Sequence, residues 1–369
     1  MSALEPSALE AWVEAKLDWQ RQQIDRLISG AGEGPRTLEN TLRPYDEAIA
    51  TLGLTGAQMS LLDSVYPDKA IRDKARDLTR KVAEAGTALS LNQEVFRALE
   101  AMEASLDPAT TDPGTAHYIS QTILNYRLAG VDKDDATRAR IRELSDKATE
   151  LVLTFSKHVQ ENVNQVVVED AAELEGLPRD YIEAHAADSE GRITLTTDYP
   201  DMQPVMTFAK SGDLRLRMFR AYNSRAYPEN RQVLLNLLAV RQEIASILGF
   251  SSWADLATAN QLMGSAANMQ AFIGQLEEAS RSGAVKEYEQ ILSFAKERQP
   301  DLEVIRGSDR GYWYEQYRRA AFDFDSQSVR PYFPYEKVAK GILETAERLF
   351  QVYFEPVEEA VVWHSSVTA

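Results

Sequence analysis

Apolar residues recur at every third or fourth position over most of this chain, which is the period of an amphipathic α-helix. The clearest stripe begins near Thr137 and consists of Ile141, Leu144, Ala148, Leu151, Phe155, Val159 and Val163. The same period predicts helices around 203–225, 229–248, 251–260 and 265–298. A further helix is expected near the N-terminus, because Ser7 and Glu10 have capping-box spacing and Gly30 follows the last apolar position.

Three short segments have the character of β-strands instead. Val166-Val167-Val168 is a β-branched run, and Ile193–Thr196 follows a turn at Ser189-Glu190-Gly191. Residues 360–364, with the sequence Ala-Val-Val-Trp-His, are apolar on both faces, as in a strand buried within a sheet. Such a strand needs neighbours, and its free edge would pair with another chain.

The pattern therefore predicts a mainly α fold, multi-helical and elongated, with a few short β-strands. We expect an N-terminal helical region at 1–165 and a second, mainly helical region with short strands at 166–369.

Composition narrows the range of partners. Apolar residues make up 44% of the chain and charged residues 26%, which is typical of a folded globular protein. A net charge of −17 argues against nucleic acid or an anionic membrane as a partner. No apolar run approaches the roughly 18–20 residues that span a bilayer, and no secretory signal is visible. A cytoplasmic location is expected, although the absence of cysteine is equally compatible with the periplasm.

No residue pattern in the chain indicates catalysis or metal binding. The four histidines have no histidine partner at i+4, so there is no H-E-x-x-H motif; they are His117, His158, His185 and His364. His158 and Glu161 share a helix face, which we interpret as a solvated contact. His185 follows Glu183 and is expected at the surface, and His364 is expected to pack or face a partner. G-x-S-x-G and P-loop motifs are also absent. We therefore predict no catalytic and no metal-ligating residue.

Aromatic residues are concentrated near the end of the sequence. Nine of the 32 aromatic residues fall within the 24 residues of 312–335. Rings at this density usually form a core, because each buries a large apolar area. Tyrosine hydroxyls also line channels for peptides. That alternative makes candidate substrate contacts of Tyr312, Tyr314, Tyr317 and Tyr332.

Several short stretches occur in an order seen in one family of zinc peptidases. They include Asn125–Gly130, Asp198-Tyr199-Pro200, Leu248-Gly249-Phe250, Tyr312–Tyr317 and Val329–Pro334. From about residue 40 onward, the chain resembles the thimet oligopeptidase family, which includes oligopeptidase A and the bacterial dipeptidyl carboxypeptidases. The resemblance implies a two-lobed helical fold around a channel that admits short peptides, and one zinc ion in the intact protein. In that family the H-E-x-x-H helix lies further downstream, so the expectation is an N-terminal portion cut before the catalytic zinc domain.

Three functions are compatible with this sequence. The preferred hypothesis is a non-catalytic portion of a zinc oligopeptidase that supplies channel wall and substrate access. In a second, a separate C-terminal catalytic fragment docks against the strand at 357–364, which could also mediate self-association. In a third, the chain is a stand-alone helical module that binds peptides without catalysis.

Overall fold

The computed structural model describes residues 4–30, 34–107, 109–325, 327–357, 360, 362, 364, 366–367 and 369. Within them it contains fourteen α-helices and one sheet of two strands, which confirms the mainly α prediction. Backbone contacts divide the chain into two compact units, which are described separately. Unit 1 comprises Met1–Ser156, Arg231–Phe272 and Ala360–Ala369, and unit 2 comprises Lys157–Asn230 and Ile273–Glu359. The division predicted at residue 165 concerns consecutive regions of the chain and stays a prediction.

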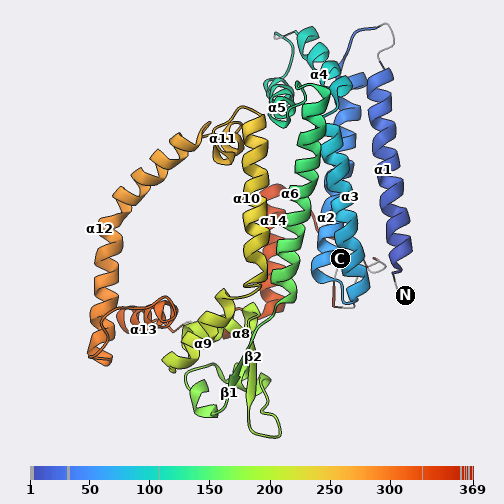
Figure 1. Cartoon of the computed structure of the whole chain (residues 1–369). Coiled ribbons are helices and arrows are strands. Elements are labelled where there is room, and N and C mark those ends of the chain that lie inside the picture. Colours follow the sequence, from blue (N-terminus) through green and yellow to red (C-terminus); the bar gives the residue numbers. More distant parts are fainter. Residues whose placement is uncertain are drawn as a thin grey trace. The chain divides into compact units, whose positions relative to one another are not determined.

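Unit 1 is built from helices, of which α1, α2 and α3 lie side by side (Figure 1). A short π-helical turn, Leu38–Leu42, precedes α2. The helices wholly or partly in this unit are α1 (Pro6–Ser29), α2 (Arg43–Val65), α3 (Lys69–Ser90), α4 (Gln93–Ser105), α5 (Pro113–Ala129), α6 (Asp135–Glu161), α10 (Glu229–Ile247), α11 (Trp253–Thr258) and α12 (Ala266–Arg298).

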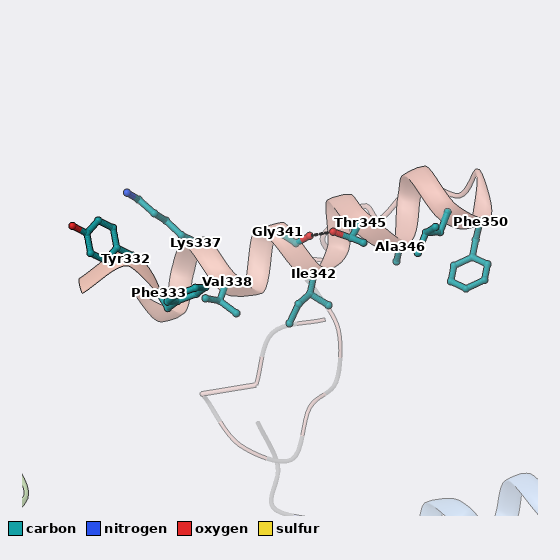
Figure 2. A pocket seen from close by; sticks show the side chains of 10 residues that line it. Tyr332, Phe333, Lys337, Val338, Gly341, Ile342, Thr345, Ala346 and Phe350 are labelled. Atoms are coloured by element: carbon teal, nitrogen blue, oxygen red, sulfur yellow. Dashed lines mark hydrogen bonds between the residues drawn. The ribbon is translucent and has the colours of Figure 1, made fainter. Parts of the chain in front are cut away.

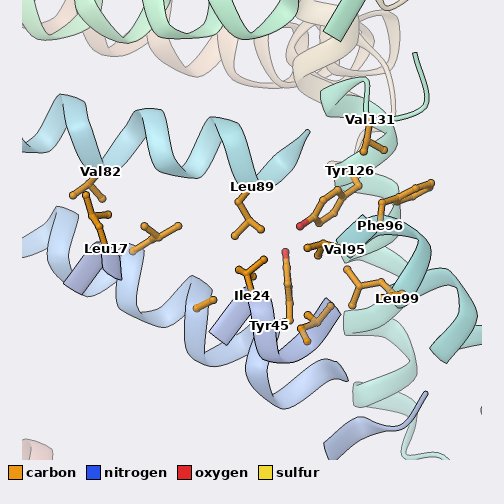
Figure 3. Close-up of a cluster of buried hydrophobic side chains, with 14 of the residues drawn as sticks. Leu17, Ile24, Tyr45, Val82, Leu89, Val95, Phe96, Leu99, Tyr126 and Val131 are labelled. Carbon is orange, nitrogen blue, oxygen red and sulfur yellow. The ribbon is translucent and has the colours of Figure 1, made fainter. Parts of the chain in front are cut away.

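The main core of unit 1 lies where α1 to α5 meet. Figure 3 shows side chains from all five helices converging, with the hydroxyl groups of Tyr45 and Tyr126 pointing toward one another. Burial raises the pKa of Tyr45 to about 12, because the phenolate would lose its hydration there. The two hydroxyl groups interact with one another, and burial raises the pKa of Tyr126 as well. This core therefore contains a pair of buried hydroxyl groups that face each other.

The start of α1 differs from the prediction. The capping box expected at Ser7 and Glu10 is wrong, because the helix begins at Pro6, its N-cap is Glu5, and no side chain caps it. Proline suits the first helical position, since its fixed φ is helical and it has no amide hydrogen to satisfy. The helix therefore begins early enough to place Ser7 inside its first turn.

Unit 2 combines a small sheet with helices. Strands β1 (Gln165–Val168) and β2 (Ile193–Thr196) pair antiparallel, with Val166 opposite Leu195 and Val168 opposite Ile193. Both strand predictions are thus confirmed. The other elements of this unit are the 3₁₀ turns Ala171–Leu174 and Arg330–Tyr332 and the helices α7 (Arg179–Ala184), α8 (Tyr199–Phe208), α9 (Gly212–Asn223), α13 (Arg310–Phe322) and α14 (Tyr335–Phe350), with the second part of α12 (Figure 1).

The single helix predicted at 203–225 is wrong, because the structure has two helices there, α8 and α9. Ser211 ends the continuity, since its side-chain oxygen accepts a hydrogen bond from the Leu214 amide at 3.2 Å and so begins a new helix. The guanidinium of Arg215 donates to the carbonyl oxygens of Ala209 and Lys210, at 2.6 and 3.1 Å. Those two carbonyls are therefore satisfied without a continuing helix.

The strand predicted at 360–364, with the docking edge at 357–364, falls largely outside the described residues, because 358, 359, 361 and 363 are not among them. Among the helices that the structure does describe, none combines the length and the apolar character needed to cross a bilayer.

Candidate functional site

Helix α13 carries three of the four candidate tyrosines, and a buried ion pair fixes its first turn within unit 2. Arg215 on α9 donates to Oδ1 of Asp309 from Nε at 2.9 Å and from Nη2 at 2.7 Å. The Arg215 side chain is only 5% exposed, and its guanidinium also stacks on the ring of Tyr312 at 4.2 Å. A charge in such a place is tolerated because every polar contact is met. The pair therefore determines where the side chains of α13 lie.

Two of the candidate tyrosines take part in packing. Tyr312 covers Arg215 and also meets Trp313 edge to face, at 5.1 Å between ring centroids. Tyr317 packs edge to face against Phe294 of α12 and Phe322, at 5.6 and 6.3 Å. Both side chains are half-buried.

Tyr314 lies in a different setting on the same helix. It is 48% exposed and lines a pocket of about 240 Å³ formed by α12, the segment after it and the first turn of α13. The structure therefore separates Tyr314 from the two packed tyrosines, although all three lie within six residues of sequence.

Tyr332 belongs to a larger apolar surface on α14, which we call the α14 surface. It encloses about 580 Å³ and is lined by Tyr332, Phe333, Lys337, Val338, Gly341, Ile342, Thr345, Ala346, Leu349 and Phe350. Figure 2 shows Phe333, Val338, Ile342 and Phe350 on one side of the helix, with Lys337 on the other. No described residue of α14 is buried, and Tyr332 is 79% exposed. Whether these four tyrosines contact substrate stays a prediction.

The expectation that the aromatic segment 312–335 forms a core is mostly wrong. Of its nine rings only that of Trp313 is buried, at 6% exposure. Six are exposed, namely Tyr314, Phe322, Phe324, Tyr332, Phe333 and Tyr335. The reason is that α13 presents one side to α8 and to Arg215 of α9, whereas the following residues reach α14, whose apolar side is uncovered in the described part of the chain.

The histidines occupy separate positions. Nδ1 of His158 lies 2.8 Å from Oδ1 of Asn230, His117 is exposed on α5, and Nδ1 of His364 lies 2.8 Å from the Ser366 hydroxyl. No group of three His, Asp or Glu side chains that could hold a metal occurs among the described residues.

The prediction of a surface role for His185 is wrong. Its side chain is 16% exposed, with Nδ1 at 2.8 Å from the Tyr181 carbonyl and Nε2 at 3.0 Å from Oδ1 of Asp201. Burial alone would raise the pKa of Asp201, but hydrogen bonds from the amide and hydroxyl of Thr196 and from His185 hold it below its usual range. Glu183, the neighbour in sequence, instead pairs with Arg179 at 2.6 Å. His185 therefore joins α7 to α8 as a structural group.

Two of the sequence stretches that carry the family resemblance meet in unit 1. Asn125 and Leu248 line a groove of about 340 Å³, where Nδ2 of Asn260 donates to Oδ1 of Asn125 at 2.7 Å. Gly130 ends α5 with φ +90°, and a Cβ on it would lie 2.6 Å from Ile141 and 2.8 Å from Leu248. These stretches therefore mark close packing between α5, α6 and α10.

Sequence reasoning missed Arg215 and Asp309 altogether. They are 94 positions apart, and no local pattern distinguishes either from a surface residue. Asn125 and Asn260 are 135 positions apart, and the periodicity of the sequence does not predict their contact either.

Comparison with known proteins gives a consistent set of relatives. The sequence model of Peptidase family M3 matches residues 205–369. Oligopeptidase A of Escherichia coli (strain K12) is 26% identical over an alignment of 361 positions that covers 94% of this chain and 53% of the bacterial protein. Saccharolysin of Saccharomyces cerevisiae is 26% identical, with coverage of 90% and 48%. Thimet-like oligopeptidase of Dictyostelium discoideum is 24% identical, with coverage of 90% and 51%.

Over most of its length the chain is therefore homologous to family M3 peptidases of the oligopeptidase A and thimet oligopeptidase type. It spans about half the length of these curated relatives.

Typical members of that family hold zinc, and the described residues of this chain do not fit such a site. A catalytic zinc takes three protein ligands around one point. Nδ1 of His158, of His185 and of His364 each lies 2.8 Å from a polar partner, and no group of three His, Asp or Glu side chains that could hold a metal occurs in the described part of the chain. No step of zinc chemistry can be assigned to them.

Proposed function

We propose that this chain forms a helical, peptide-binding part of a zinc oligopeptidase of the family M3 type, and that it carries none of the groups that perform hydrolysis. The observation that supports the proposal best is the similarity to Oligopeptidase A along 94% of the chain. Similarity of that extent makes short peptides the expected ligands. The scattered histidines support the second part of the proposal, because a zinc peptidase needs ligands that converge.

Two surfaces of unit 2 have the character that peptide binding requires. The α14 surface offers an apolar strip of about 580 Å³, and the pocket at Tyr314 offers about 240 Å³ with polar groups at its edge. Pockets that bind ligands combine mostly apolar walls with a few placed polar groups. Tyrosine suits both surfaces, since its ring buries apolar area while its hydroxyl stays available for hydrogen bonds.

Peptide binding is tested directly by fluorescence anisotropy with labelled peptides of varied sequence and the complete chain. We expect saturable binding that weakens when Tyr314 or Tyr332 is replaced by alanine. Tyr199→Ala is the matched control, because Tyr199 is 66% exposed and lines neither surface. Each loss is expected to be about three- to tenfold, as for one partly exposed aromatic contact.

Absence of binding at millimolar peptide would refute the peptide-binding part of the proposal. Equal weakening by all three alanine variants would refute the assignment to these two surfaces and leave peptide binding itself intact.

A further inference from the structure

The pocket beside α13 has an unusual supply of hydrogen-bond donors. Its apolar walls come from Ala284 and Ile291 on α12 and from Ile305, and its edge carries Arg306 and Arg310. Both arginines are exposed, and neither guanidinium group forms an ion pair or hydrogen bond with a residue that the structure describes. The chain has 57 acidic and 40 basic residues, so two neighbouring unpaired guanidinium groups are conspicuous against that excess.

A tyrosine adds a third donor. The hydroxyl oxygen of Tyr288 accepts a hydrogen bond from the Ile305 amide at 3.2 Å. Because the oxygen acts as the acceptor in that hydrogen bond, the hydroxyl proton of Tyr288 can still be donated to a ligand. The bond also holds the segment after α12 against that helix. Only one acidic side chain, that of Glu287, lines the pocket.

The first turn of α13 begins beside the same pocket. Gly307 and Arg310 line the pocket, and Arg310 is the first residue of this thirteen-residue helix. The residue before it, Asp309, is the N-cap, but its side chain makes no capping hydrogen bond and accepts two hydrogen bonds from Arg215 at Oδ1 instead. The amides of the first turn therefore receive no hydrogen bond from the Asp309 side chain.

We propose that this pocket binds a carboxylate group, and that the C-terminus of a peptide supplies it. The choice of a peptide rests on the proposed function, whereas the choice of a carboxylate rests on the donors alone. Arginine matches a carboxylate with two parallel hydrogen bonds, which lysine cannot do. A volume of about 240 Å³ is below the range of about 300–1,000 Å³ for whole small-molecule ligands, so it suits a chain end.

Three versions of one labelled peptide test this proposal on the complete chain. The first has a free C-terminal carboxylate and no acidic side chain, the second has a C-terminal amide, and the third is the amide with one internal glutamate. We expect the free acid to bind about tenfold more tightly than the plain amide, the effect of one charge-assisted interaction at an exposed site. That preference should shrink when salt is raised from 0.1 M to 1 M, because the Debye length falls from about 10 Å to about 3 Å.

Variants then locate the effect. Replacing both arginines, Arg306→Gln with Arg310→Gln, should remove the preference for the acid, and their exposure makes a folding defect easy to exclude by circular dichroism. Arg220→Gln is the matched control, since Arg220 is an exposed arginine of unit 2 away from the pocket, and it should retain the preference.

The possible results distinguish a failure of the carboxylate site from a failure of peptide binding as such. Tight binding of the glutamate peptide would support the carboxylate site and make a side chain its source. Equal affinity for all three peptides, or a preference that survives in the double variant, would overturn the site while leaving peptide binding in place. Binding of none of them would contradict both.

Discussion

Removing the guanidinium of Arg215 is the most informative single perturbation of unit 2. The substitution Arg215→Met keeps much of the side-chain volume but removes four hydrogen bonds at once. It leaves the Asp309 carboxylate, at 12% exposure, without its cation, and frees the Ala209 and Lys210 carbonyls. Breaking a buried ion pair from one side costs about 3–5 kcal/mol, because the remaining charge stays buried and uncompensated. We expect α9 and α13 to be the helices that lose this stability.

Hydrogen exchange followed by mass spectrometry measures this loss where it occurs. A loss of about 3–5 kcal/mol lowers the protection of amides in α9 and α13 by roughly two to four orders of magnitude, up to the limit set by global unfolding. Arg281→Gln is the matched control within unit 2, because its i,i+4 pair with Glu277 is about two-thirds exposed on both sides and should contribute less than about 0.5 kcal/mol. Protection in α13 that changes no more in Arg215→Met than in the control would refute the anchoring role.

Three further substitutions test individual contacts. Tyr126→Phe should destabilise unit 1 by about 0.5–1.5 kcal/mol, because it leaves the buried hydroxyl of Tyr45 without its partner; an unchanged midpoint in urea unfolding would contradict this. Gly130→Ala should destabilise unit 1 by at least about 1–2 kcal/mol, because φ is +90° and the new methyl meets Ile141, and an unchanged unfolding midpoint would contradict this. Asp201→Asn should destabilise unit 2 by about 1–3 kcal/mol at neutral pH. Because the pKa of Asp201 is lowered on folding, its contribution to the free energy of unfolding is complete above the ordinary carboxyl pKa of about 3.9. That contribution is lost as pH falls toward the folded-state pKa. The stability of the variant should lack this acid dependence, and a pH profile identical to that of the unmodified chain would contradict the assignment.

The helices and strands of this chain were largely predictable from local pattern. The stripe that begins near Thr137 corresponds to α6, and the β-branched run at 166–168 lies in β1. Both patterns reflect which side of an element is buried, a property that each element carries in its own sequence. Helix boundaries were less predictable, since the break between α8 and α9 depends on the side chain of Arg215 satisfying carbonyls from outside the helix.

The candidate sites depend on contacts that local pattern does not contain. His185 is half-buried because Asp201 reaches it from α8, and Arg215 is buried because Asp309 lies beside it after 94 intervening positions. Aromatic density in the sequence also proved a poor guide to burial. Trp313 and Tyr335 belong to the same dense segment, yet the first is buried and the second is 81% exposed. Burial of a ring depends on which helix faces it, and that is decided by tertiary packing.

Part of the family resemblance comes from residues that the structure places in close packing. Gly130 and Leu248 are recognisable because neighbouring helices approach them closely, and neither is a chemical group. This explains how packing positions alone can indicate the relatives of a sequence.

Cleavage of an internally quenched peptide by the purified chain, with zinc supplied at saturation, tests the central claim most directly. The proposal predicts that a peptide which binds in the anisotropy assay is not cleaved above the rate in buffer, and that bound zinc after dialysis stays far below one ion per chain. Zinc-dependent cleavage that follows the chain through successive purification steps, together with stoichiometric zinc, would contradict it.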